Sequence, residues 1–254
     1  MKIYKNLFLI LLIILSMSSC TSQKKLIYLQ NAEGGTVTEE VKFTYTFRPG
    51  DIIAINVYSL NENAARIFNV NKGSVSTATS YYSEQATYIN GFFVSDSGYI
   101  KLPIIGDVMV QGLNREETSL LLTELMQEYF FDAIVDVKLA NFKFTILGEV
   151  QRPNTYKVYD TRINIFEAIG MAGDLNVYGR REIILVRQVG DSQIVFDIDL
   201  KSKNIMSQDY YYVLPNDIIY VKPHKSKIYG FSTVPITLIF TTISTLILII
   251  NFLK

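Results

Sequence analysis

Few residues in this chain could carry out acid–base, nucleophilic or metal chemistry. The only histidine is His224, in a short basic linker, and the only cysteine is Cys20. General acid–base catalysis usually relies on a histidine or on carboxylates whose pKa values are shifted. Asp197 and Asp199 alternate along one face of a predicted strand, but no basic or nucleophilic residue accompanies them in the sequence. We therefore expect no catalytic residue and no enzymatic activity.

The same residue counts argue against metal and nucleic-acid sites. A metal site built from histidine and cysteine needs three or four such ligands, and the carboxylates show no spacing typical of an all-oxygen site. Without Lys2 and Lys5 of the expected export signal, 22 basic residues remain against 24 acidic ones. Nucleic-acid binding needs a clustered basic surface. We expect no metal, no cofactor and no nucleic acid.

Two clusters of tyrosines could bind a ligand without covalent chemistry. Flat aromatic faces can stack on sugar rings, but aromatic residues are also favoured in packed strands and in interfaces. For Tyr210, Tyr211 and Tyr212 we favour packing. For Tyr81 and Tyr82, which lie in a long polar stretch, both interpretations stay open.

The cysteine fits an anchoring role better than a chemical one. Lys2 and Lys5 precede an apolar run, and small residues lead directly into Cys20. This is the layout of an export signal with its cleavage site. A lone cysteine in an exported chain otherwise needs a partner. We predict a lipoprotein signal peptide at residues 1–19 and lipidation of Cys20, with a plain signal peptide and an incidental cysteine as the alternative.

The C-terminal end carries a second membrane feature. No charged residue occurs from Ile228 to Leu253, and the stretch from Pro235 to Leu253 is 19 residues long. About 20 residues are needed to cross a ~30 Å hydrocarbon core at ~1.5 Å per residue. We therefore expect a transmembrane helix over residues 231–253.

Polar residues recur along this segment at helical spacing. They are Thr233, Thr237, Thr241, Ser244 and Asn251. In lipid, hydroxyl and amide groups on one helix face favour contact with other helices or with water. We interpret the stripe as pore-lining or as a contact between helices. The alternative is that each hydroxyl bonds the carbonyl four residues earlier in its own helix.

The residues between the two ends are enough for one or two compact domains. A polar tether, residues 20–40, comes first. We then expect strands at 52–58, 92–94, 99–103 and 107–110, the second and third forming a hairpin, followed by a helix over 115–130 and a half-buried strand at 133–139. Asn114 and Glu117 are spaced as the capping pair of that helix.

A second group of elements starts at Phe142. It comprises strands at 142–146 and 156–158, a short helix capped by Asn164 with Glu167 three residues later, and strands at 182–187, 193–200 and 214–221. This order predicts a small sheet covered by one helix. The expected fold class is therefore α+β.

Two turns introduce strands in a similar way. They are Pro49, Gly50 and Asp51 before the first strand, and Pro215, Asn216 and Asp217 before the last one. Glycine and asparagine are the residues that best tolerate the positive φ of a type II turn. We interpret the similarity as shared turn chemistry and not as a sequence repeat.

Several of these motifs, in this order, resemble those of a known family. Arg48 to Asp51, then Gly98 to Gly106 and the helix from Asn114, resemble the polysaccharide export domain of outer-membrane exopolysaccharide exporters. Gly148 to Tyr156 and Glu167 to Gly173 resemble the soluble ligand-binding β-grasp module of that family, and Leu214 to Val221 resembles its closing strand. The resemblance covers roughly residues 40–223.

The resemblance implies a small mixed-sheet export domain at 41–140 and one β-grasp domain at 141–223, followed by the C-terminal transmembrane helix. It implies a lipid-anchored outer-membrane protein whose soluble domains face the periplasm. Copies would form a homo-oligomeric ring with a porin-like exit for a capsular or extracellular polysaccharide, without covalent chemistry. An inner-membrane polysaccharide co-polymerase would be its partner.

The chain also departs from the pattern of this family. Asp174 stands where a further glycine is usual, and only one β-grasp unit is present where larger relatives carry more. The alternative function is a non-transporting, glycan-binding scaffold lipoprotein of the envelope.

Overall fold

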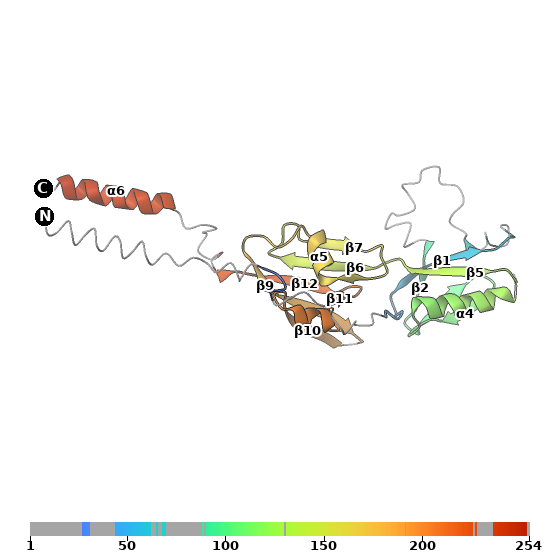
Figure 1. Ribbon diagram of the computed structural model, residues 1–254. Coiled ribbons are helices and arrows are strands. Elements are labelled where there is room, and N and C mark those ends of the chain that lie inside the picture. The colour runs from blue at the N-terminus through green and yellow to red at the C-terminus, as the bar shows by residue number, and fades with distance from the viewer. Residues whose placement is uncertain are drawn as a thin grey trace, which may run out of the picture.

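The computed structural model describes residues 27–30, 44–61, 65, 68–69, 88, 90–129, 131–190, 192–225, 227 and 236–252. Two packed units follow each other along this part of the chain, and each has its own hydrophobic core. We call the described residues of 44–140 the first unit and those of 141–225 the second unit. Figure 1 shows the two units end to end, with helix α6 standing apart from both.

A three-stranded antiparallel sheet forms the first unit. Strand β1 (Ile52–Tyr58) lies between β2 (Phe92–Phe93) and β5 (Ile134–Leu139). Strands β3 (Tyr99–Leu102) and β4 (Gly106–Met109) form a separate hairpin. The expected pairing of 92–94 with 99–103 is therefore wrong. Residues 92–94 instead lie against the start of β1. The carbonyl of Val94 accepts a hydrogen bond from the Gly50 N–H, and the Val94 N–H donates to the carbonyl of Asp51.

Helix α4 (Arg115–Gln127) covers this sheet and confirms the predicted capping pair. The side chain of Asn114 accepts a 2.9 Å hydrogen bond from the backbone N–H of Glu117, and the Glu117 carboxylate accepts one of 2.9 Å from the Asn114 backbone. Two otherwise orphaned N–H groups are thus satisfied at the helix start. Leu122 and Met126, one turn apart, are fully buried in the core.

Hydroxyl groups of α4 also satisfy the open edge of strand β5. Thr123 Oγ1 accepts a 3.1 Å hydrogen bond from the backbone N–H of Val135, and Ser119 donates to the carbonyl of the same residue. An unpaired strand edge invites association with other strands. Here the helix side chains occupy that edge in place of a further strand.

The second unit is a five-stranded sheet with one face covered. Its order is β10 (Ser192–Asp199), β9 (Gly179–Val189), β12 (Ile218–Pro223), β6 (Lys143–Gly148) and β7 (Asn154–Lys157). Only β12 and β6 run parallel, and the other neighbouring strands of this sheet are antiparallel. The covering layer consists of α5 (Ile165–Met171), the 3₁₀ helix η2 (Lys203–Ser207) and the small ladder of β8 (Ile163–Asn164) with β11 (Tyr212–Val213).

Helix α6 (Ile236–Phe252) is shorter than the expected C-terminal helix. Its described part has 17 residues, fewer than the ~20 that usually cross a ~30 Å hydrocarbon core. Among the described residues, no helix is both long enough and apolar enough to cross a membrane. The transmembrane helix expected over 231–253 is therefore wrong. The mixture of helices and strands in the two units remains that of an α+β fold.

Candidate functional site: the open face of the second unit

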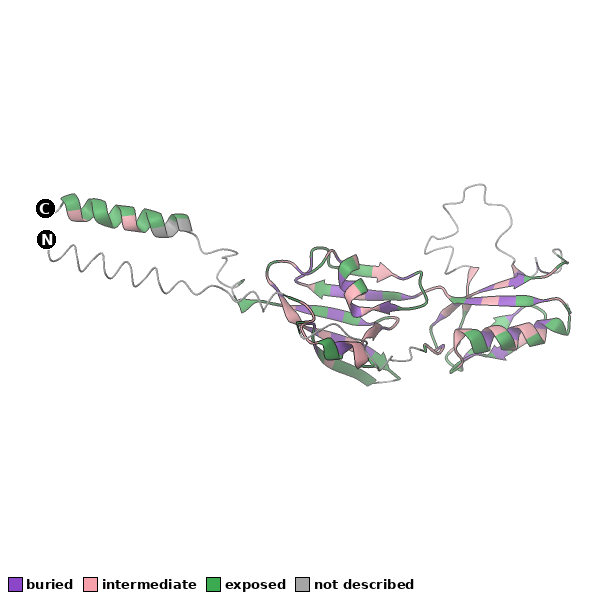
Figure 2. Cartoon of the chain, viewed as in Figure 1, coloured by how far each residue is buried: buried purple, intermediate pink, exposed green. Residues whose placement is uncertain are grey.

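One face of the five-stranded sheet has no covering layer. Ile183, Leu185 and Ile219 are fully buried against the core that includes α5. Their neighbours along the same strands point to the opposite side, because side chains alternate along a strand. Figure 2 shows this alternation of buried and more exposed residues along the strands, with β10 exposed over most of its length. We call this uncovered side the open face.

Two rows of apolar side chains cross the open face. The strand register places Val195, Val186 and Ile218 in one row, and Ile184, Tyr220 and Leu147 in the next. Val195 is 59% exposed, Leu147 45%, Ile218 40% and Tyr220 38%. An antiparallel sheet face that only meets water is usually polar. A contiguous apolar patch of this kind marks an interaction surface.

Two lysines lie beside the apolar rows, at the end of the open face nearest the first unit. Lys143 of β6 and Lys157 of β7 are direct cross-strand partners. Like charges placed opposite each other destabilise a sheet. In the adjacent row the hydroxyls of Thr145 and Thr155 lie 2.9 Å apart and share a hydrogen bond. This end of the face thus places two lysines side by side next to a pair of hydroxyls.

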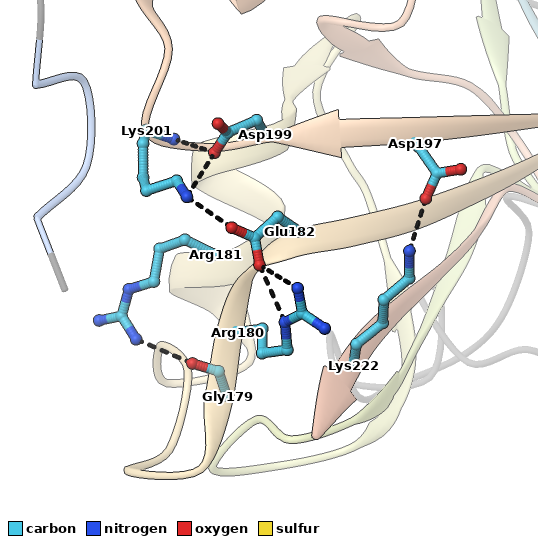
Figure 3. A network of polar contacts seen from close by, with 8 residues as sticks. All are labelled: Gly179, Arg180, Arg181, Glu182, Asp197, Asp199, Lys201 and Lys222. Atoms are coloured by element: carbon cyan, nitrogen blue, oxygen red, sulfur yellow. Dashed lines mark hydrogen bonds and ion pairs between the residues drawn. The ribbon is translucent and has the colours of Figure 1, made fainter. Parts of the chain in front are cut away.

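A network of ion pairs closes the other end of the open face (Figure 3). The Glu182 carboxylate accepts hydrogen bonds from Lys201 Nζ at 2.5 Å and from Arg180 Nε at 2.9 Å. The hydrogen bond from Lys201, assisted by the one from Arg180, lowers the pKa of Glu182. The same interaction raises the pKa of Lys201. These charges are mutually satisfied and define the border of the apolar rows.

The paired aspartates considered as a chemical motif belong to this network. Lys222 Nζ lies 2.5 Å from Asp197 Oδ1, and Lys201 Nζ lies 3.7 Å from Asp199 Oδ1. The expectation that no basic residue accompanies these aspartates is therefore wrong, because the fold brings Lys222 across from a position 25 residues away. In the described residues no group of three or more histidine, cysteine or acidic side chains could hold a metal.

The segment from Ile27 to Gln30 is held at this same end of the second unit. Leu29 and Gln30 donate backbone hydrogen bonds of 3.2 and 2.7 Å to the carbonyls of Leu200 and Lys201. The Tyr28 hydroxyl donates to Asp174 Oδ1 at 2.5 Å. Burial, together with this hydrogen bond, raises the pKa of Tyr28.

The unusual residue Asp174 has a structural reason at this position. Its backbone has φ +73°, a conformation in which glycine is commonest and which aspartate tolerates better than most residues. The aspartate adds a carboxylate that accepts from Tyr28 and from the backbone N–H of Leu175 at 2.6 Å. The aspartate thereby provides a contact for the segment from Ile27 to Gln30.

The two Pro-x-Asp turns have the same hydrogen-bonded geometry. Gly50 and Asn216 have φ values of +89° and +66°. Asp51 Oδ2 accepts from the Arg48 N–H at 2.9 Å, and Asp217 Oδ2 accepts from the Leu214 N–H at 2.8 Å. In each turn the aspartate N–H also donates to the carbonyl three residues earlier. Proline and aspartate together close each turn at the head of its strand.

The first of these turns contacts the second unit. Arg48 Nη1 donates a 3.3 Å hydrogen bond to the carbonyl of Gln188 at the end of β9. Burial raises the pKa of Asp217, against the opposing effects of Arg187 and, to a smaller extent, of the Arg48 charge. Asn141, the first residue of the second unit, accepts from the Ile52 N–H at 2.9 Å and donates to the Gly50 carbonyl at 3.1 Å. We call this region the joint.

The remaining residues singled out in the sequence are distributed away from the open face. Cys20, Thr233 and the tyrosines Tyr81 and Tyr82 lie outside the described residues. Thr237, Thr241, Ser244 and Asn251 are exposed on α6. Ser244 Oγ donates to the carbonyl of Phe240 at 2.7 Å, four residues earlier. Ser244 therefore bonds within its own helix, which is the alternative to a pore-lining or helix-contact role.

The tyrosines at 210 and 211 pack against the protein core, the interpretation that the sequence favoured over sugar stacking. Tyr210 and Tyr211 are half-buried against the core of the second unit. Tyr211 meets Phe166 edge-on at 6.5 Å between ring centroids, and Phe196 lies 5.4 Å from Tyr210. The rings therefore fill gaps between the covering layer and the sheet.

Sequence reasoning missed the open face, although a signal for it exists. Ile183 to Val186 and Ile218 to Val221 are continuous apolar runs. A strand with only one buried face alternates between apolar and polar residues, whereas a continuous run indicates apolar residues on both faces. Such runs also occur in strands that are covered on both sides. In this protein, alternate residues of the two runs form part of the exposed apolar rows.

Comparison with known proteins places the first unit in a family. Residues 39–140 match the sequence model of the polysaccharide biosynthesis/export proteins. The chain carries the domain of this polysaccharide biosynthesis/export family. From here we call the first unit the export domain. A similar protein is the EPS I polysaccharide export outer membrane protein EpsA of Ralstonia solanacearum, with 26% identity over 137 residues. That match covers 52% of this chain and 36% of the relative, so the chain spans about a third of the length of its relative.

Proposed function

We propose that this protein is an outer-membrane component of polysaccharide export. The observation that carries the proposal is the family match over residues 39–140, which coincides with a folded unit that has its own core. The name of the Ralstonia relative, a polysaccharide export outer membrane protein, supports the same role and location. The substrate is a capsular or extracellular polysaccharide, and the chain moves it without covalent chemistry.

We further propose that Cys20 carries the lipid anchor and that both units face the periplasm. Seven residue steps separate Cys20 from Ile27, and an extended chain reaches at most ~25 Å over that distance. The docking of Ile27–Gln30 on the second unit supports a position of this unit close to the anchored membrane. The export domain then points away from that membrane, towards an inner-membrane polysaccharide co-polymerase.

Assembly into a homo-oligomeric ring completes the proposal. Helix α6 exposes large apolar side chains such as Phe240, Leu248 and Phe252, which are 64%, 69% and 91% exposed. Such a surface is unstable in water unless it is covered. We propose that copies of α6 cover one another, with Thr237, Thr241, Ser244 and Asn251 as the polar stripe between them and Thr233 at its start.

The test is gene replacement in the cells that make this protein. Deleting the gene should abolish surface polysaccharide, and Cys20→Ala should abolish metabolic labelling with palmitate and release the protein from the outer-membrane fraction. Ser22→Ala, two residues away, serves as the matched control and should behave as the unmodified chain. Surface polysaccharide that persists in the deletion strain would contradict the export role. Palmitate labelling of the Cys20→Ala chain would contradict the anchor.

A further inference from the structure

The end of the second unit from which the chain leads to α6 gathers loops from distant parts of the sequence. Strand β9 begins there at Gly179, whose cross-strand partner is Pro223 at the end of β12. Residues 149–153 lie in the same place, because the N–H of Asn176 donates to the Glu149 carbonyl at 3.1 Å. Figure 1 shows this end turned towards α6. We call it the α6 end.

A hydrogen-bonded loop at the α6 end holds an apolar side chain in the solvent. Val177 is 77% exposed. The side chain of Asn176 accepts from the Tyr178 N–H at 2.8 Å and donates to Glu149 Oε2 at 2.9 Å. The Asn176 carbonyl accepts from the Gly179 N–H at 3.0 Å, which closes the turn. The loop therefore keeps Val177 on its outer side, because turning it inwards would break these bonds.

Two basic side chains lie beside this loop. Arg181 Nη1 donates to the Gly179 carbonyl at 3.1 Å, and Figure 3 shows its guanidinium directed away from Glu182. The residue before Lys225 donates its backbone N–H to the Tyr178 carbonyl at 2.7 Å. Lys225 itself is exposed. Both cations are therefore held at the same end of the unit as the loop.

Arg152 adds a third cation on the other side of the loop. Its N–H donates to the Ala172 carbonyl at 2.9 Å, at the end of α5, and its side chain is exposed. Other cations at the α6 end form ion pairs with carboxylates. Among the described residues, no carboxylate lies within ion-pair distance of Arg152, Arg181 or Lys225. These three positive charges are therefore not neutralised within that part of the chain.

The segment that docks on this end contributes a second apolar side chain. Ile27 is 46% exposed, and Lys24 and Lys25 precede it in the sequence. Its neighbour Tyr28 lies under Arg181, whose guanidinium carbon is 5.0 Å from the ring centroid. The α6 end thus presents exposed apolar side chains together with cations.

This combination is typical of a protein surface that meets a lipid bilayer. Apolar side chains enter the boundary between head groups and acyl chains, while cations pair with the phosphates of anionic lipids. A single exposed valine is ordinary on a protein surface. Here it projects between unneutralised cations, at the end that also holds Ile27 and the link to α6. A free phosphate or a polyanion would neutralise the cations but would not cover Val177.

We propose that the α6 end rests on the membrane surface, with Val177 among the lipid head groups. Arg152, Arg181 and Lys225 pair there with the phosphates of anionic lipids. A lipid on Cys20 fixes one point of the chain, whereas this contact also fixes the orientation of the second unit. The inference rests on the proposed outer-membrane location and deepens it by naming the residues that meet the bilayer.

The experiment measures contact between position 177 and lipid head groups in the full-length protein. Val177→Cys carries a fluorescent dye, and the protein is placed in lipid nanodiscs that contain a head-group spin label, which quenches a dye that touches it. The matched control is Tyr159→Cys, at a residue that is 78% exposed and follows β7 at the opposite end of the sheet. The unmodified chain, treated with the same dye, corrects for any labelling of Cys20.

Quenching should be at least about twofold stronger at 177 than at 159, and stronger in discs with phosphatidylglycerol than in discs of phosphatidylcholine alone. Arg152→Glu with Lys225→Glu should remove at least about half of the quenching at 177, because repulsion replaces attraction. Lys101→Glu with Lys138→Glu makes the same charge change at exposed lysines of the export domain and should have no effect. Circular dichroism checks the folding of each variant.

The outcomes separate this contact from other possibilities. Equal quenching at 177 and 159, which needs no charge variant, would overturn the proposal. Quenching that ignores anionic lipid or the Arg152 and Lys225 reversal would do the same. Inorganic phosphate at the lipid phosphate concentration should leave the quenching unchanged, and its loss would assign the cations to free phosphate. Export is tested separately, because persistent surface polysaccharide in cells that lack the gene contradicts the proposed function and leaves the quenching unaffected.

Discussion

Arg187 and Asp217 form a buried ion pair that joins β9 to the turn before β12. Nη2 of Arg187 lies 2.7 Å from Oδ2 of Asp217, and the side chains are 7% and 1% exposed. Arg187 also donates to the carbonyls of Asp209 and Tyr212 at 3.2 and 2.8 Å. The arginine therefore fastens the last strand and the covering layer to the centre of the sheet.

Replacing Asp217 by asparagine should strongly destabilise the protein. The substitution leaves the Arg187 charge buried without its counter-ion, which costs about 3–5 kcal/mol in the free energy of unfolding. Because the chain has no tryptophan, unfolding in urea is best followed by far-ultraviolet circular dichroism. The matched control is Asp51→Asn in the equivalent turn. Asp51 accepts from the neutral Tyr45 hydroxyl at 2.8 Å, so the loss there should be about 1–3 kcal/mol. Equal losses would contradict the special role of the ion pair.

Alanine at Gly148 should be far more harmful than alanine at Gly50. Both glycines have φ close to +90°, so each alanine carries the strain of a left-handed conformation, about 1–2 kcal/mol. A Cβ at Gly50 meets nothing within 4 Å, whereas a Cβ at Gly148 would collide with the carbonyl oxygen of Val221 on the neighbouring strand. Urea unfolding of the two variants measures the difference. A Gly148→Ala protein as stable as Gly50→Ala would show that β6 and β12 can separate without cost.

Acid should weaken the end of the second unit that faces α6. The hydrogen bond from Lys227 lowers the pKa of Glu149, and that from Lys201 lowers the pKa of Glu182. A carboxyl whose folded pKa lies below its unfolded value stabilises the fold above the unfolded value and loses this contribution as the pH falls through the folded one. Stability should therefore decrease as the pH drops below the ordinary value of 4.5.

A variant with both Glu149→Gln and Glu182→Gln isolates this acid effect. Its stability at neutral pH should be lower than that of the unmodified chain, and its further loss on acidification should be smaller, because the two titrating carboxyls are gone. Urea midpoints across a pH series measure both. Parallel curves for the two proteins would rule these carboxyls out as the acid-sensitive groups.

Removing the Tyr28 side chain should release the segment from Ile27 to Gln30. Tyr28→Ala loses the hydrogen bond to Asp174 and the edge contact with Phe166, whose ring centroid lies 6.0 Å away. Trypsin should then cut after Lys24 or Lys25 several-fold faster, since cleavage follows local opening. Tyr159→Ala, at a residue that is 78% exposed, is the matched control. Unchanged cleavage would show that the backbone bonds to Leu200 and Lys201 hold the segment without the tyrosine.

Local signals in the sequence predict local structure well in this protein. The caps at Asn114 and Asn164 lie where predicted, because a capping box depends on residues three apart in one chain segment. The expected strands at 52–58 and 193–200 are found as β1 and β10 with nearly the same bounds. Pairing is less predictable. Phe92 and Phe93 pair with β1 and not with the nearer β3, because contacts with Gly50 and Asp51 compete for the same segment.

The candidate site shows the same division between local and long-range information. The sequence by itself determined the turn residues, the caps, the α+β order of elements and the motifs of polysaccharide export. Only the tertiary structure decided that Lys143 and Lys157 stand opposite each other and that Lys222 reaches Asp197. It also shows that no helix within the described residues is long and apolar enough to cross a membrane. The reason is physical: caps and turns are closed by bonds within a few residues, whereas register and sheet coverage depend on segments brought together from far apart in the chain.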